Sequence, residues 1–74
     1  MKPYIIIELI DGKLGAVRST KSYKKALKMA TETAMYNHGD QSDEAREAIK
    51  AELFKEGNWC DITGNIWVHI KQLD

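Results

Sequence analysis

Apolar residues are spaced along the chain in two ways, one typical of strands and one typical of helices. Residues 4–10 are rich in β-branched side chains and precede Asp11-Gly12, a strong signal for a tight hairpin turn. Residues 13–19 are therefore predicted to return as a second strand. We expect the more apolar of the two hairpin faces to meet the helices. That face carries Ile5, Ile7, Leu9, Leu14 and Ala16.

Two further stretches repeat apolar residues every three to four positions, as amphipathic helices do. The first helix is predicted over Ser22–Asn37, with Ser22 as its N-cap. Its apolar stripe consists of Tyr23, Ala26, Leu27, Ala30 and Ala34. The second helix is predicted to begin at a cap supplied by Asp40 or Ser42 and to end at Gly57-Asn58. Because the link between the helices is short, we expect them to be antiparallel neighbours.

The last element is predicted to be a second hairpin, and its register decides which side chains face the helices. A two-residue loop places Asp61 on the apolar face of the final strand, residues 66–73. A three-residue loop, Thr63–Asn65, pairs Cys60 with Val68 and makes that face wholly apolar. We prefer the three-residue loop because a buried unpaired carboxylate is expensive.

The predicted order ββααββ is that of a single compact α+β domain over residues 1–74. The simplest assembly is a four-stranded antiparallel sheet with both antiparallel helices packed on one face. The other face of the sheet is then left open. Aromatic side chains on an uncovered sheet are typical of interaction surfaces, so we expect a protein-binding site there, for a foreign partner or for a second copy in a homodimer. Its predicted residues are Tyr4, Ile6, Trp59, Trp67 and His69.

The charges are balanced over the whole chain but not within its halves. Residues 1–39 hold seven basic and three acidic side chains, whereas residues 40–74 hold four basic and eight acidic ones. A dipolar protein can steer toward a charged partner or pair head to tail with itself. Two solvated helix faces of opposite sign are the alternative interpretation, and the sequence does not decide between them.

Four lysines along one edge of the first predicted helix form a candidate nucleic-acid-binding surface. They are Lys21, Lys24, Lys25 and Lys28. Lysines in such a row, with aromatic residues nearby, can follow a phosphate backbone. The net charge of zero and the acidic second helix argue against this function. Nucleic-acid binding is therefore the alternative to protein binding.

The sequence offers little for catalysis, and we expect neither an enzyme nor a cofactor or metal site. Cys60 is the single cysteine, and His38 and His69 are the only histidines. Neither histidine lies in metal-ligand spacing with a carboxylate or a thiol. Cys60 and His69 could be drawn as a nucleophile pair, but the preferred register places them on opposite faces.

The sequence also indicates the cellular compartment. A lone thiol without a signal peptide is typical of a protein in the reducing cytosol. The longest apolar run, Ile5–Ile7, is far shorter than a membrane span, and no membrane association is expected.

The layout of the chain resembles that of small single-domain proteins encoded by phages and mobile elements. The likeness is carried by the opening run Tyr4–Gly12, a short return strand, a helix with Tyr23 and Ala26, and the closing run Ile66–Ile70. Some of those proteins, among them anti-CRISPR proteins, block bacterial defence complexes by occupying a site. The resemblance therefore implies a non-enzymatic inhibitor, and it transfers no functional residue.

Overall fold

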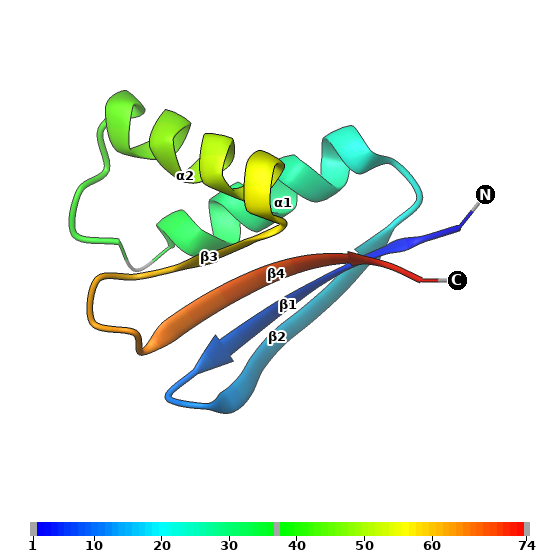
Figure 1. Ribbon diagram of the computed structural model, residues 1–74, viewed down its shortest axis with the longest axis horizontal. Helices are drawn as coiled ribbons and strands as arrows, with labels where there is room; N and C mark the ends of the chain where they lie inside the picture. Colours follow the sequence, from blue (N-terminus) through cyan, green and yellow to red (C-terminus); the bar gives the residue numbers. More distant parts are fainter. Residues whose placement is uncertain (1, 37, 74) are drawn as a thin grey trace.

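The computed structural model describes residues 2–36 and 38–73, which form four strands and two helices in the predicted order (Figure 1). The elements are β1 (Tyr4–Ile10), β2 (Lys13–Thr20), α1 (Tyr23–Met35), α2 (Asp43–Glu56), β3 (Asn58–Cys60) and β4 (Ile66–Gln72). The sheet is antiparallel with the order β2-β1-β4-β3, and both helices lie on one of its faces. The predicted α+β fold is confirmed.

The helix ends are set by local hydrogen bonds. The Ser22 hydroxyl accepts from the backbone N–H of Lys25, and the Ser42 hydroxyl accepts from that of Ala45. Ser42, rather than Asp40, is therefore the N-cap of α2. The helix α2 ends at Gly57, as predicted, and Gly57 has the left-handed conformation. The helix α1 ends at Met35, and the end predicted at Asn37 lies outside the described residues.

The first hairpin turns at Asp11-Gly12, where both residues have positive φ. Leu9 pairs with Leu14 as predicted. Gly15 then forms a bulge, so every pair between Tyr4–Glu8 and β2 is displaced by one residue from the predicted register.

The predicted core face of this hairpin is wrong. Ile6 is 2% exposed and lies in the core, so the alternating side chains of Ile5, Ile7 and Leu9 lie on the opposite face. Leu14 pairs with Leu9 and is 65% exposed. Of the five residues predicted to meet the helices, only Ala16 lies on their side of the sheet.

The second hairpin differs from its predicted register by one residue. Trp59 pairs with Val68 and Cys60 with Trp67, because the loop spans the four residues 62–65. The predicted three-residue loop is therefore wrong. The shift moves Trp59 into the core, where it is 7% exposed, and leaves Cys60 on the opposite face.

The Asp61 carboxylate stabilises this longer loop. It accepts hydrogen bonds from the backbone N–H groups of Asn65 (2.9 Å) and Ile66 (3.2 Å) and from the Thr63 hydroxyl (2.8 Å). Desolvation raises the pKa of Asp61, but these hydrogen bonds outweigh it and hold the pKa below its usual value. The Asp61 carboxylate, which would be costly if buried without a partner, therefore has its hydrogen-bond partners within its own loop.

Asp61→Asn is expected to lower the melting temperature at pH 7 by several degrees. A pKa that is lower in the folded state means that ionised Asp61 stabilises the fold above its unfolded-state pKa of 3.8. This stabilisation is lost as the pH falls through the folded-state pKa, so the variant and the wild type should converge once the pH lies below that pKa. Thermal denaturation followed by circular dichroism measures both values.

The matched control is Asp11→Asn, because Asn tolerates the positive φ at this turn. Within residues 2–36 and 38–73 the Asp11 side chain accepts no hydrogen bond, so this control should keep the melting temperature of the wild type at pH 7. An Asp61→Asn deficit of equal size at both pH values would mean that shape, not charge, matters in the loop.

The core lies between the helices and one face of the sheet. It consists of Ile6, Ala26, Ala30, Ala34, Met35, Ile49, Leu53, Trp59 and Val68. The alanines of α1 allow the helix to approach the sheet closely. All eight residues of β2 are described, and none of them is buried. Within residues 2–36 and 38–73, neither helix is long and apolar enough to cross a membrane.

Candidate protein-binding site

The sheet face turned away from the helices is apolar across all four strands, and we call it the open face. Its residues are Ile5, Ile7 and Leu9 of β1, Leu14 and Val17 of β2, Trp67 and His69 of β4, and Cys60 of β3. The strand pairing places them in two rows. One row runs Leu14, Leu9, Trp67, Cys60, and the next runs Val17, Ile7, His69, Asn58. Cross-strand neighbours of this kind form one continuous surface.

The aromatic part of the open face is held in a fixed orientation. The rings of Trp67 and His69 are stacked, with centroids 5.9 Å apart and planes 9° apart. The indole N–H of Trp67 donates to the Gly64 carbonyl at 3.0 Å. Trp67 nevertheless stays 39% exposed. A large, fixed and accessible ring is the type of side chain that dominates protein interfaces.

The centre of the open face carries no lysine, arginine, aspartate or glutamate. Among its described residues and the residues that pair with them across the strands, Lys71 is the only one of these four types, and it lies opposite Ile5 near the end of β4. A partner can therefore cover the centre without desolvating an ion, which would be costly.

The structure divides the predicted binding residues between two faces. Trp67 and His69 lie on the open face, as predicted. Ile6 and Trp59 lie in the core, and Tyr4 packs against it, with its ring 5.3 Å from that of Tyr23. The one-residue shift in the second hairpin moves Trp59 into the core, whereas Ile6 and Tyr4 lie on the core side because the helices cover the face of β1 opposite to the predicted one.

Sequence reasoning missed Ile5, Ile7 and Leu9, the aliphatic residues of β1 on the open face, because it assigned them to the helix side. A signal was present, because the run Ile5–Ile7 is apolar without alternation. Such a run is typical of a strand that is covered on both faces.

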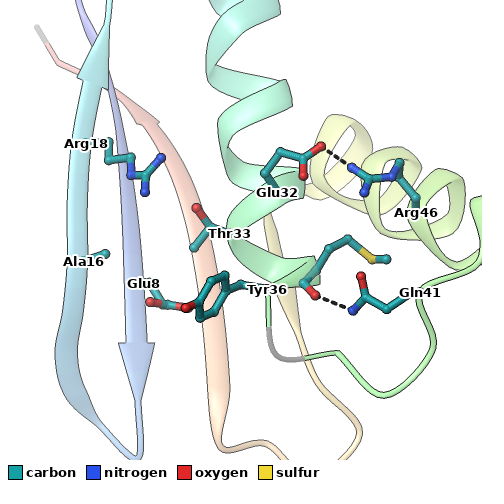
Figure 2. A pocket seen from close by; sticks show the side chains of 9 residues that line it. Glu8, Ala16, Arg18, Glu32, Thr33, Tyr36, Gln41 and Arg46 are labelled. Atoms are coloured by element: carbon teal, nitrogen blue, oxygen red, sulfur yellow. Dashed lines mark hydrogen bonds and ion pairs between the residues drawn. The ribbon is translucent and has the colours of Figure 1, made fainter.

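On the helix side, a groove of about 470 Å³ lies between β2 and the C-terminal half of α1, and we call it the β2 groove (Figure 2). Arg18 and Ala16 line it from β2 and Glu8 from β1. Glu32 of α1 and Tyr36, which follows that helix, line the other side. Glu32 forms an ion pair with Arg46 of α2. The groove exists because β2 extends beyond the cover that the helices provide.

A second groove, of about 570 Å³, lies between α1 and α2 and contains most of the predicted lysine row. Lys24, Lys25 and Lys28 line it, whereas Lys21 lies elsewhere, beside Tyr4 and Tyr23. Arg46 and Lys50 of α2 also line this groove, together with Glu32 and Glu47. Arg46 and Lys50 were not predicted as part of a basic surface because α2 is acidic in overall composition.

The structure corrects one argument about catalysis. Cys60 and His69 share the open face instead of lying on opposite faces. The Cys60 thiol donates to the Asp61 carbonyl at 3.1 Å, and no hydrogen bond joins it to His69 in the described part of the chain. Within residues 2–36 and 38–73, no three His, Cys, Asp or Glu side chains are grouped as a metal site.

No protein-family model matches the chain, and neither a curated protein nor a solved structure gives a match. The function is therefore argued from the surfaces of this chain.

Proposed function

We propose that this domain is a non-catalytic protein-binding module and that its open face is the contact surface. The observation that supports the proposal is the uncovered sheet face with two apolar rows around the Trp67–His69 stack. With about 3.3 Å per residue and about 4.8 Å between strands, the face measures roughly 20 by 15 Å. An exposed apolar patch of a few hundred Å² is typical of a site that another protein covers.

Inhibition of a bacterial defence complex is the specific form of this proposal, in line with the resemblance to phage-encoded proteins. A rigid sheet with a neutral, apolar face supports binding that occludes a site without chemistry. A protein of this kind would restore phage plating on an immune host, and a variant with a disrupted open face would not. Plaque counts on such a host that stay unchanged with the wild-type protein would remove this specific form.

Val17→Glu and Trp67→Ala are each expected to weaken partner binding at least tenfold while preserving the fold. Val17 is 53% exposed at the edge of the open face, so a carboxylate there stays solvated in the free protein but must be desolvated in a complex. Trp67→Ala removes the central ring. Light scattering first gives the oligomeric state, because a dimer would identify the partner as a second copy. For a monomer, cross-linking in the host cell compares the partners of each variant.

The matched control is Phe54→Ala on the outer side of α2, where Phe54 is 67% exposed. This variant should keep the partner. Equal loss of the partner in Phe54→Ala and Trp67→Ala would place the contact surface elsewhere.

Nucleic-acid binding is a second candidate function, and the groove between the helices favours it. Lys50 and Arg46 join Lys24, Lys25 and Lys28 there, so both helices contribute cations to one concave surface. Such a surface can hold a phosphate backbone.

Lys25→Glu combined with Lys28→Glu is expected to abolish this binding, whereas Lys71→Glu, which is outside the groove, should not. The affinity of the wild type for a 20-nucleotide strand should fall at least tenfold between about 50 and 200 mM salt, because bound phosphates release counterions. Fluorescence anisotropy measures both effects. Absence of binding at the lower salt concentration would exclude this function.

A further inference from the structure

The strand β2 has an unpaired outer edge. It lies at one end of the order β2-β1-β4-β3 and spans eight residues, Lys13–Thr20, whereas the opposite edge strand β3 spans only three. An edge strand presents a row of backbone N–H and C=O groups that can pair with another extended chain. The bulge at Gly15 interrupts this edge near the turn and leaves residues 16–20 as the regular part.

The β2 groove lies directly beside this regular part on the helix side. Ala16 and Arg18 of β2, with Glu8 of the neighbouring strand β1, form one wall of the groove. Glu32 and Thr33 of α1 and Tyr36, the residue that follows α1, form the other wall (Figure 2). Tyr36 is 82% exposed, so an aromatic ring is available at the far wall. A strand added to β2 would direct every second side chain toward this groove and the others toward the open face beside Val17.

The charges of the edge favour an acidic partner. Lys13 and Arg18 are the charged side chains of β2, and both are basic. Within residues 2–36 and 38–73, the Arg18 guanidinium has no hydrogen bond or ion pair, whereas Glu32 is already paired with Arg46. A carboxylate directly across from Arg18 would form a cross-strand pair of opposite charges, which stabilises neighbouring strands.

The same charges disfavour a second copy of this chain at the edge. Antiparallel pairing of β2 with itself would bring two identical basic strands together, and like charges on neighbouring strands are destabilising. The edge strand itself therefore favours a different chain that places a carboxylate opposite Arg18.

We propose that β2 accepts an extended acidic segment of a partner protein as a fifth strand, with alternate carboxylates at the β2 groove beside Arg18. This inference goes beyond the proposed function, because it uses the strand edge and not the open face. Backbone pairing supplies the affinity, and the groove selects side chains at every second position.

The test uses a nine-residue peptide of alternating glutamate and valine, capped at both ends, titrated into the full chain. Amide hydrogen exchange and backbone NMR shifts should change in β2 and leave α2 unaffected. Arg18→Glu should weaken binding at least tenfold, and Trp67→Ala should leave it unchanged. Trp67 belongs to the open face and not to the β2 edge. Loss of peptide binding in Arg18→Glu therefore tests the strand-edge proposal, and loss of partner binding in Trp67→Ala tests the open-face proposal.

Two further peptides separate strand pairing from charge attraction alone. One peptide is N-methylated at its odd-numbered residues and the other at its even-numbered residues. In a paired strand, only the N–H groups of every second residue point toward β2. One of the two peptides should therefore lose binding while keeping its charge. Equal binding of both methylated peptides, equal binding of a lysine–valine peptide, or no change in β2 at millimolar peptide would overturn the proposal.

Discussion

Replacing Trp59 with alanine is expected to destabilise the fold by about 3–5 kcal/mol. Trp59 is 7% exposed, pairs with Val68 across the sheet, and lies with its ring 5.9 Å from that of His38. A domain of this length has a total stability of roughly 4–11 kcal/mol, so the variant should lose a large fraction of its stability. Urea denaturation followed by far-UV circular dichroism measures the loss.

The second tryptophan of the chain supplies the control. Trp67 is 39% exposed and lies on the open face, so Trp67→Ala should cost about 1 kcal/mol or less. The two variants remove the same side chain from opposite faces of one hairpin. A cost for Trp67→Ala as large as that for Trp59→Ala would contradict the placement of these residues.

Leu53→Ala is expected to destabilise the domain by about 2–5 kcal/mol. Leu53 is fully buried in the core cluster and lies one turn before the end of α2, where its carbonyl accepts from the Gly57 N–H at 2.9 Å. Removing its side chain would leave a cavity between α2 and the sheet. Chemical denaturation gives the free energy of unfolding.

The adjacent residue Phe54 is the comparison. It is 67% exposed and contacts Tyr23 edge-to-face at a centroid distance of 6.3 Å. Such aromatic pairs contribute about 0.5–1.5 kcal/mol, so Phe54→Ala should cost no more than this. If the Leu53→Ala cost fell to the same value, the core assigned to α2 would be wrong.

The features that the sequence predicted correctly are those set by short stretches of chain. Ser22 caps α1, Asp11-Gly12 forms the first turn, and Gly57 ends α2. Each depends on hydrogen bonds or backbone angles within a few residues. The element order and the layer arrangement follow from these signals.

The strand registers were predicted less well because side-chain details override the apolar pattern. A Cβ atom on Gly15 would lie 3.0 Å from Oε1 of Glu8, so the bulge there suits a residue without a side chain. In the second hairpin, the hydrogen bonds to Asp61 select a four-residue loop. Neither effect is visible in the alternation of apolar and polar residues.

The candidate site was predicted only in part for a related reason. Trp67 and His69 follow from their alternation with Val68 in β4. The contribution of β1 depends on the strand order, which places Leu9 beside Trp67, and the sequence left that order open. Because both faces of β1 are apolar, its pattern did not indicate which face the helices cover.

The central position of β1 and β4 has a consequence for synthesis of the protein. These strands pair along their full lengths, with Tyr4 opposite Gln72, yet they are the first and last elements of the described chain. Ribosomes add about 5–20 residues each second, so β1 emerges seconds before its inner neighbour exists. During these seconds the hairpin β1–β2 is exposed with the inner edge of β1 unpaired. The sheet is completed only after β4 has left the ribosome.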